Sequence, residues 1–216
     1  MCPSPNVEEW KSDPVGMLTV HQAHPYELGQ SIADLVDNSY DANASRIEAD
    51  IGLTDEDERM YVLILDDGDG IAKNKWQDTM MLGGTRARKD NDLGVYGIGL
   101  KLSSLSQANE VTVASIHKAT GDFGVRRISA NHIRATGRNE VLMYPIPDSQ
   151  VYSDTRQRMI DEGWSTMVLL EDMHAQSRII RMDKKPITAI NKEIKRITAH
   201  LGLTYQRVIE SGERGN

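Results

Sequence analysis

Apolar residues recur at helical spacing in the first part of the chain. Ile32, Leu35 and Val36 fall on one face of a 3.6-residue period, with polar residues at most of the positions between. Pro25 suits the first turn of a helix, where its missing N–H would have no partner. The pattern predicts a first long helix that runs as far as Ala42.

A two-residue period follows. Residues 46–53 alternate apolar and polar side chains, and residues 61–65 form a short apolar run. The acidic segment at residues 54–59 lies between them and has the composition of a turn. The two runs are therefore predicted to be strands that pair as a β-hairpin.

The remainder of the chain alternates between short helical and extended patterns. Gly68 and Gly70 end the second strand, and the polar, glycine-containing stretch at residues 83–92 is typical of a mobile lid. The other predicted elements are helices at residues 73–82 and 97–108 and strands at residues 111–117, 124–128, 141–146 and 165–171. Helices combined with strands that are mostly adjacent in sequence predict a two-layer α/β sandwich.

A long final helix is predicted over residues 183–210. Its apolar positions keep to one stripe, formed by Ile187, Ile190, Ile194, Ile197, Leu201 and Tyr205. Such a stripe needs a surface to pack against, and a domain absent from this chain is one candidate.

The charge is unevenly distributed. Residues 178–207 contain eight Lys or Arg and two acidic residues, so their net charge of +6 leaves −13 for the rest of a chain that totals −7. A solvated helix face is the ordinary interpretation of the basic segment. A surface for DNA or for a protein partner is the alternative.

Length and composition fit one domain with the start of a second. The chain has 216 residues, of which 39% are hydrophobic and 26% charged, and with a single Phe its core must consist of Ile, Leu, Val and Met. Cys2 is the only cysteine, which excludes an intramolecular disulfide and a cysteine-rich zinc site. The apolar runs are shorter than the ~20 residues that span a bilayer, and the N-terminus lacks the pattern of a signal peptide. We therefore expect a soluble, cytoplasmic protein with no membrane partner.

Asp34 and Asn38 are the first candidates for chemistry. They are four residues apart in the first predicted helix, so their side chains project from the same face. An amide oxygen can ligate Mg²⁺, and a carboxylate can orient a water for attack. An exposed helix face is the ordinary meaning of this spacing, and the pair alone does not decide between the two.

A loop rich in Asp and Gly, Asp66-Asp67-Gly68-Asp69-Gly70-Ile71, directly follows the second strand of the hairpin. A calcium-binding EF-hand is excluded, because Gly68 and Gly70 fall at its third and fifth positions and Gln77 at its twelfth, where the ligands should be. Asp66 can instead accept a hydrogen bond from an exocyclic amine. Gly68 and Gly70 would let a flat base approach the backbone.

A third segment, Gly94-Val95-Tyr96-Gly97-Ile98-Gly99-Leu100-Lys101, opens a predicted helix. Its glycines free the backbone to wrap an anion, the helix N-terminus supplies unpaired N–H groups, and Lys101 adds a positive charge. The segment matches neither a P-loop nor a Rossmann fingerprint. It predicts a phosphate-binding loop, with a helix start that uses glycines for packing as the alternative.

Taken in order, residues 33–42, the loop at residues 66–71 and the segment at residues 94–101 resemble the three nucleotide-binding boxes of the GHKL superfamily of gyrase, heat-shock chaperone, histidine kinase and MutL ATPases. Residues 163–168, Gly-Trp-Ser-Thr-Met-Val, are similar to the later Gly/Thr strand of the same pocket. The form Gly-x-Tyr-Gly-x-Gly-Leu-Lys, which follows Leu-Gly-Gly-Thr-Arg at residues 82–86, resembles most closely MORC-like members and related prokaryotic ATPases.

The resemblance implies a Bergerat fold, in which helices cover one face of a mixed, mostly antiparallel sheet and Mg-ATP binds beneath a flexible lid. It implies that Asn38 ligates Mg²⁺, that Asp66 accepts a hydrogen bond from the adenine amine, and that Thr166 supports Asp66. Ile71 would form a wall for the base. The other residues of the implied ATP site are Gly68, Gly70, Thr85, Gly94, Val95, Tyr96, Gly97, Ile98, Gly99, Leu100 and Lys101.

The catalytic carboxylate departs from the family pattern. The gyrase, MutL, chaperone and MORC branches have a Glu four residues before the Asn, where this chain has Asp34, one methylene shorter. A displacement of about an ångström can lower a rate on the order of 100-fold. Glu27 lies about 10 Å away along the helix axis, and Asp37 points from another face, so Asp34 remains the candidate base. We therefore expect ATP binding, with hydrolysis that is slow or lost.

The expected function is that of an ATPase module whose lid closes on ATP and promotes dimerisation, driving conformational change on DNA or in a larger assembly. A non-hydrolysing ATP sensor is one alternative. A histidine-kinase catalytic domain is another, although no helical hairpin that could carry a phospho-acceptor His precedes the first helix.

The expected organisation has three parts. These are an N-terminal segment at residues 1–24, the ATP-binding domain at residues 25–175, and a C-terminal helix at residues 176–216 that leads toward a transducer-like domain absent from this chain. In the family that domain supplies a Lys to the terminal phosphate. The chain is thus expected to be either the N-terminal part of a longer protein or a stand-alone nucleotide switch.

Overall fold

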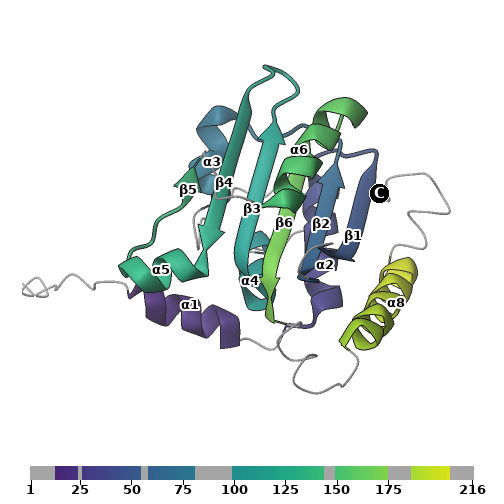
Figure 1. Ribbon diagram of the computed structural model, residues 1–216. Coiled ribbons are helices and arrows are strands. Elements are labelled where there is room, and N and C mark those ends of the chain that lie inside the picture. The colour runs from purple at the N-terminus through teal and green to yellow at the C-terminus, as the bar shows by residue number, and fades with distance from the viewer. Residues whose placement is uncertain are drawn as a thin grey trace, which may run out of the picture.

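A six-stranded sheet forms the centre of the fold (Figure 1). The computed structural model describes residues 13–23, 26–54, 58–80, 99–143, 149–174 and 186–204. In spatial order the strands are β1 (Ile47–Leu53), β2 (Met60–Asp66), β6 (Thr166–Met173), β3 (Ala108–Ile116), β4 (Phe123–Ser129) and β5 (Leu142–Met143). Each neighbouring pair in this order is antiparallel, so the sheet expected to be mixed and mostly antiparallel is antiparallel throughout the described residues.

The first two strands form the predicted hairpin. Their register pairs Ile47 with Asp66 and Leu53 with Met60. β2 is buried along nearly its whole length, because β1 and β6 flank it and other elements cover both of its faces. Burial on both faces explains why its sequence is a continuous apolar run and does not alternate.

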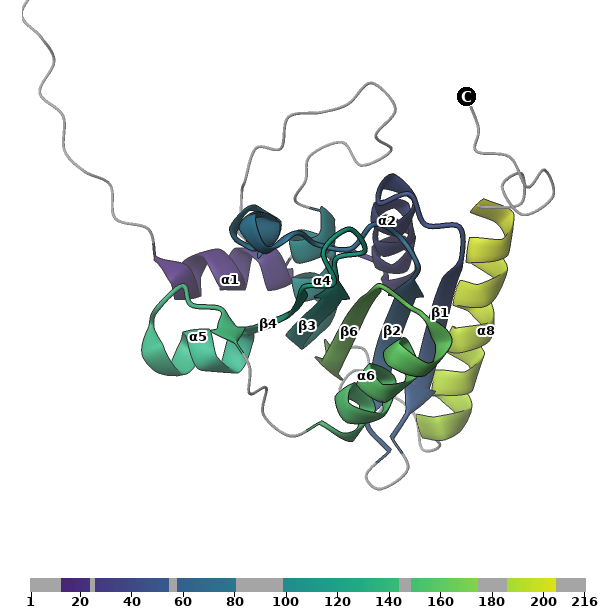
Figure 2. The same ribbon diagram turned by 90° about the horizontal axis from the view of Figure 1, so that it is seen from above.

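Most of the helices lie over one face of the sheet (Figure 2). This layer contains α1 (Pro14–Ala23), α2 (Leu28–Asp41), α3 (Trp76–Met80), which continues the short 3-10 turn η1 (Lys73–Lys75), and α4 (Gly99–Gln107). α5 (Ala130–Thr136) packs against α1 and β3 at the side of the layer. Val62 and Ile64 of β2 point into the hydrophobic cluster that these helices share with the sheet. The predicted α/β sandwich of a sheet and a layer of helices is therefore confirmed.

One helix, α6 (Gln150–Glu162), covers the opposite face of the sheet (Figures 1 and 2). Its Tyr152 and Met159 join a second cluster with Leu63 and Leu65, the β2 residues that alternate with those facing the main helical layer. The expectation of helices on one face thus describes the main layer and omits α6. A strand that is apolar on both faces needs a cover on each side.

α5 and α6 were not predicted from the sequence, although both carry clear end signals. Ser129 caps α5 by accepting from the N–H of His132, and Ser149 caps α6 by accepting from the N–H of Tyr152. Both helices end at a glycine in the left-handed region, with φ of 66° at Gly137 and 73° at Gly163. A Ser before and a Gly after a short polar segment are the signals that could have located them.

α2, which carries two of the candidate site residues, begins at Leu28 and ends at Asp41. Glu27 occupies the N-cap position and forms a capping box with Gln30. Pro25, which was expected in the first turn, lies outside the described residues.

The C-terminal helix α8 (Pro186–Thr204) lies beside β1 in Figures 1 and 2 and contacts α2. Ile190 and Ile197, two members of the predicted stripe, are buried, and Ile197 belongs to the main core cluster. At these positions the stripe packs within this chain. The predicted helix ends at residues 183–185 and 205–210 lie outside the described residues. Within the described ranges, no helix is both long and apolar enough to cross a membrane.

Candidate functional site

Asp66 lies at the end of β2, where three strands bring polar side chains to one end of the sheet. It pairs in register with Thr166 on β6, which in turn pairs with Ser115 on β3. The side chain of Asp66 is buried, with 4% of the residue exposed. Ser39 donates to its Oδ2 over 3.0 Å, and the N–H of Gly68 donates to its Oδ1 over 2.9 Å. The hydroxyl of Ser165 lies 3.4 Å from Oδ1.

This environment leaves Asp66 with acceptor capacity. An ionised carboxylate offers about four lone-pair sites, and the three donors from Ser39, Gly68 and Ser165 use three of them. Burial raises the pKa of Asp66, while the hydrogen bonds from Gly68, Ser39 and Ser165 oppose that rise. Asp66 is thus a buried acceptor that can take one further donor at Oδ2.

The hydroxyls of Thr166 and Ser115 lie 3.2 Å apart beside Asp66. Ser115 also accepts from the backbone N–H of Ile71 over 2.9 Å, which connects the end of the loop at residues 66–71 to β3. The side chain of Ile71 is half-buried. The structure therefore brings Asp66, Ile71 and Thr166 together, as expected from the sequence. It adds three serines to which the sequence assigned no role: Ser39, Ser115 and Ser165.

The glycines of this loop are required by its contacts with the rest of the protein. A Cβ at Gly68 would lie 2.6 Å from the carbonyl oxygen of Ala42. Gly70 has a φ of +73°, and a Cβ there would collide with the carbonyl oxygen of Ile116. Besides any room they leave for a base, these glycines let the loop pack against the end of α2 and the end of β3.

Asp67 and Asp69 fix the same loop through hydrogen bonds to residues between α2 and β1. Asp67 accepts from the backbone N–H groups of Ser45 and Arg46 at 2.8 and 2.7 Å. Burial acts to raise the pKa of Asp67, but these hydrogen bonds, with the Ser45 hydroxyl and the charge of Lys118, lower it overall. Asp69 accepts from Asn43 over 2.7 Å. Both carboxylates are therefore engaged in fixing the loop on the turn between α2 and β1.

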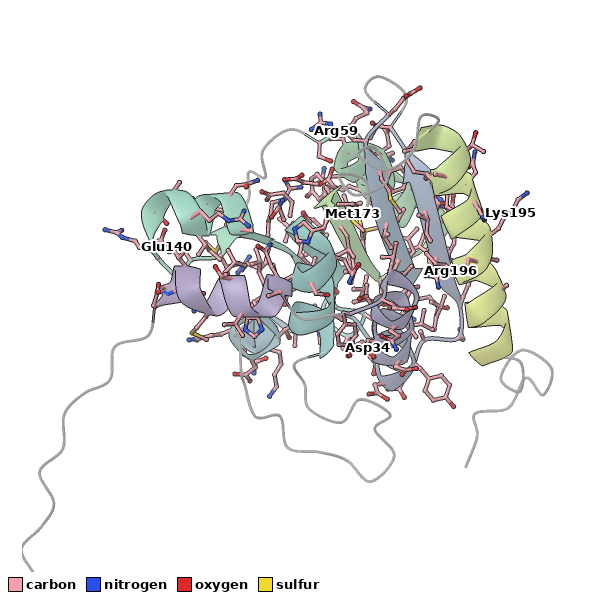
Figure 3. All side chains as sticks on the ribbon, turned by 90° about the horizontal axis from the view of Figure 1, so that it is seen from below. Asp34, Arg59, Glu140, Met173, Lys195 and Arg196 are labelled. Carbon is pink, nitrogen blue, oxygen red and sulfur yellow. The ribbon has the colours of Figure 1, made fainter. Side chains whose placement is uncertain are left out.

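Asp34 and Asn38 lie one turn apart on α2, as predicted, and Figure 3 shows Asp34 on this helix. Nδ2 of Asn38 donates to the backbone carbonyl of Asp34 over 2.7 Å, which leaves its amide oxygen as the end available to a cation. Asp34 is half-buried, and Oδ2 accepts from the hydroxyl of Tyr26 over 2.9 Å. Burial raises the pKa of Asp34, and the hydrogen bond from Tyr26 opposes the rise.

α4 runs antiparallel to α2, which orients its N-terminal end. Nε2 of Gln107 donates to the carbonyl of Tyr26 over 2.8 Å, and the hydroxyl of Ser31 donates to the carbonyl of Ser103 over 3.2 Å. Because the two helices run in opposite directions, the C-terminal end of α4 lies near the start of α2. The first turn of α4 at Gly99 therefore lies toward the half of α2 that carries Asn38. This is the geometry in which helix N–H groups could meet an anion beside a cation held by Asn38.

Part of the predicted phosphate-binding set lies outside the described residues. Gly99, Leu100 and Lys101 begin α4, but their side chains are not among the described ones. Thr85, Gly94, Val95, Tyr96, Gly97 and Ile98 also lie outside, as does the lid predicted at residues 83–92.

Residues 26–161 match the family described as Histidine kinase-, DNA gyrase B-, and HSP90-like ATPase. The chain belongs to this family. The match includes Asp34, Asn38, Asp66 and the segment at residues 94–101, whereas Thr166 lies beyond its end. The resemblance to GHKL ATPases is thereby confirmed, and with it ATP binding and ATPase activity as properties of the family.

Two plant proteins are also similar to this GHKL chain. Protein MICRORCHIDIA 1 of Arabidopsis thaliana is 27% identical over 170 residues, which cover 74% of this chain and 26% of that protein. Protein MICRORCHIDIA 6 of the same organism is 27% identical over 131 residues, which cover 58% of this chain and 20% of that protein. The expected likeness to MORC-like members is consistent with these similarities, and the chain spans only a minor share of the length of these relatives.

Proposed function

We propose that this GHKL domain binds Mg-ATP at the end of the sheet marked by Asp66 and hydrolyses it slowly. The observation that carries the proposal is the buried Asp66 carboxylate, which is surrounded by donors and retains acceptor capacity at Oδ2. Burying a carboxylate is costly unless its hydrogen bonds are made. An exocyclic amine at Oδ2 supplies the donor that completes the set.

The adenine base fits the polar and apolar groups beside Asp66. Asp66 accepts from the exocyclic amine, and Ile71 provides an apolar wall. Thr166 shares a hydrogen bond with Ser115, and Ser115 in turn holds the backbone of Ile71. Thr166 therefore supports the base site through Ser115 and through its position opposite Asp66 in the sheet.

The phosphates and magnesium belong on the side of α2. Asn38 donates its amide N–H to the helix backbone and presents its oxygen to Mg²⁺, which usually takes one or two protein ligands and completes its shell with waters and phosphate oxygens. The phosphates lie against the N-terminus of α4 and the segment at residues 94–101, with Thr85 and Lys101 as further contacts.

Asp34 is the proposed general base. It lies one turn before Asn38 on the same helix face, so a water held by Asp34 lies beside the phosphates that Asn38 helps to fix. Half-burial raises its pKa, which makes the carboxylate a better proton acceptor. Asp is one methylene shorter than the Glu of related branches, so the water is held less closely and turnover is slow.

A non-hydrolysing ATP sensor is the second candidate, and Asp34 is again the reason. Its side chain is one methylene shorter than the Glu of related branches, so a water that Asp34 holds can lie too far from the terminal phosphate to attack it. In either case we propose that residues 83–92 close over ATP and that the closed domain self-associates. The basic segment at residues 178–207 is the proposed contact for DNA or a protein partner, and the proposed location is the cytoplasm.

Calorimetry with Mg-ATP tests the nucleotide site. Asp66→Asn should weaken binding by roughly 10- to 150-fold, the effect of losing a hydrogen bond to a charged group worth about 1.5–3 kcal/mol. Asp50→Asn, which removes a carboxylate from β1, is the matched control and should leave affinity unchanged. Equal affinities in all three proteins would show that the base is read elsewhere.

A single-turnover experiment with ATP labelled on its terminal phosphate separates the activities. An ATPase releases the label as inorganic phosphate, a sensor leaves it on ATP, and a histidine kinase transfers it to protein. Label on the protein would contradict the proposed function, and intact ATP after prolonged incubation would favour the sensor.

A further inference from the structure

Tyr26 contacts the carboxylate that the proposed function places beside the reacting water. Its hydroxyl donates to Oδ2 of Asp34 over 2.9 Å. Tyr26 precedes Glu27, the N-cap residue of α2, and is eight residues before Asp34. Tyr26 therefore lies outside the helix that carries Asp34, and the periodic pattern of that helix could not have revealed the contact.

The backbone of Tyr26 is itself anchored. Its carbonyl accepts from Nε2 of Gln107, a buried side chain at the end of α4, over 2.8 Å. The same nitrogen lies 3.0 Å from the hydroxyl of Ser106. Tyr26 is thus held between the start of α2 and the end of α4, so its hydroxyl has a defined position relative to Asp34.

We infer that Tyr26 is a positioning residue for Asp34, whose hydroxyl holds Oδ2 and leaves Oδ1 to orient the attacking water. This inference rests on the proposed function. An Asp side chain has one torsion fewer than a Glu, so a single hydrogen bond leaves it little freedom. The contact compensates in part for the missing methylene. A base that is held in one orientation loses less of its catalytic rate to misalignment with the water.

The protonation states suit this role. Burial raises the pKa of Asp34, and the Tyr26 hydrogen bond counteracts the rise because it favours the ionised form. Burial, together with the hydrogen bond to Asp34 and its charge, raises the pKa of Tyr26, which therefore stays protonated as a donor at neutral pH. Tyr26 thus orients Asp34 through a donor that is retained at neutral pH.

Several other charged groups on the elements packed against α2 have partners of their own, and others are exposed. Asp66 at the end of β2 is held by the donors described above, Glu48 on β1 binds Arg158, and Arg196 on α8 lies 3.4 Å from Glu27. Asp50 on β1 accepts from Tyr61, and Lys192 and Lys195 on α8 are exposed. Lys101 on α4 has no described side chain.

Tyr26→Phe removes the hydroxyl and keeps the ring. Tyr61→Phe is a matched control, because Tyr61 donates to Oδ2 of Asp50 over 3.0 Å across the β1–β2 hairpin, away from the site. The carboxyl-carbon chemical shift of Asp34 at neutral pH in the nucleotide-free proteins should change in Tyr26→Phe and stay the same in Tyr61→Phe. An unchanged shift in Tyr26→Phe would overturn the inference.

Turnover supplies the second readout. Tyr26→Phe should lower kcat roughly 10-fold, the low end of what a hydrogen bond to a charged group contributes. ATP affinity should stay within about threefold. In an Asp34→Ala background the same change should cause no further loss. A fall in ATP affinity as large as the fall in kcat would indicate a structural role and overturn the inference.

The two proposals fail in different ways. Turnover that depends on Asp34 but is unaffected by Tyr26→Phe would overturn the role of Tyr26 alone. Turnover that is absent, or that Asp34→Ala leaves unchanged, would overturn the proposed base and with it the positioning role.

Discussion

The hydroxyl of Ser39 donates to Oδ2 of Asp66 over 3.0 Å and thereby joins α2 to the end of β2. Ser39 directly follows Asn38, the proposed magnesium ligand, while Asp66 is the proposed acceptor for adenine. This buried hydrogen bond helps to hold α2, which carries the proposed magnesium ligand, against the strand that carries the proposed adenine acceptor. The distance between the two halves of the proposed nucleotide site should therefore respond to this contact.

Ser39→Ala should weaken both the fold and the nucleotide site. Loss of a buried hydrogen bond to a carboxylate is expected to lower the free energy of unfolding by about 1–3 kcal/mol. ATP affinity should fall a few-fold, because Asp66 loses the donor that orients Oδ2. Denaturant unfolding and calorimetry measure the two effects, with Ser153→Ala on the exposed side of α6 as control. Unchanged affinity would mean that the Ser39 contact serves stability alone.

The pH dependence of nucleotide binding should report on Asp66. Burial raises its pKa, and only the ionised carboxylate accepts freely from the adenine amine. Affinity should therefore be complete above the raised pKa and fall as the pH drops through it, beginning at a higher pH than for an ordinary Asp. Calorimetry across the acidic range should show this step in the parent protein and lose it in Asp66→Asn. A step that persists in the variant would belong to another group.

Gly70→Ala should be far more damaging than Gly121→Ala. Both glycines have a φ of +73°, so both changes carry the strain of the left-handed region, about 1–2 kcal/mol. A Cβ at Gly121 meets nothing within 4 Å, whereas at Gly70 it collides with the carbonyl of Ile116. The collision should add roughly 1–3 kcal/mol of destabilisation. Equal free energies of unfolding for the two variants would contradict the described packing of the loop at residues 66–71.

Residues 83–92 should gain protection only when a triphosphate is bound. Their small and charged side chains offer little apolar area to hold the segment down by itself. Hydrogen exchange of the nucleotide-free, ADP-bound and ATP-bound protein measures this directly. Protection that is the same in all three states would contradict the lid.

The elements that could be predicted from the sequence are those whose apolar residues follow a single clear periodicity. The hairpin of β1 and β2 was predictable because its apolar pattern and acidic turn agree, and α2 because its apolar positions share one face. α6 was missed since its buried residues are few and its outward positions strongly polar, so the capping Ser149 and the terminal Gly163 are clearer signals than its periodicity.

The candidate site shows the same division. Asp34, Asn38 and Asp66 could be named from short-range spacing and motif order. Ser165, Ser115 and Tyr26 reach the site through strand register and through contacts between residues far apart in sequence. Such contacts depend on the tertiary fold, which a single sequence does not display.

Substitutions at Asp34 and Asn38 should separate hydrolysis from binding. If Asp34 orients the attacking water, Asp34→Ala should keep ATP affinity within a few-fold and lower turnover by about 100-fold or more. Asn38→Ala should instead damage magnesium-dependent binding itself, because it removes a metal ligand. Calorimetry with and without magnesium, beside steady-state phosphate release, distinguishes the two patterns.

Asp34→Glu lengthens the side chain to that of the Glu found in the related branches. It should raise turnover if the half-buried position of Asp34 has room for another methylene and if the longer side chain still meets Tyr26. Asp37→Glu, an equally small change on another face of α2, is the control and should leave turnover unaltered. If Asp34→Ala does not slow phosphate release in a protein that measurably turns over, Asp34 is not the base. Its carboxylate would then serve the magnesium shell or the helix, and the sensor would be the better account of the chain.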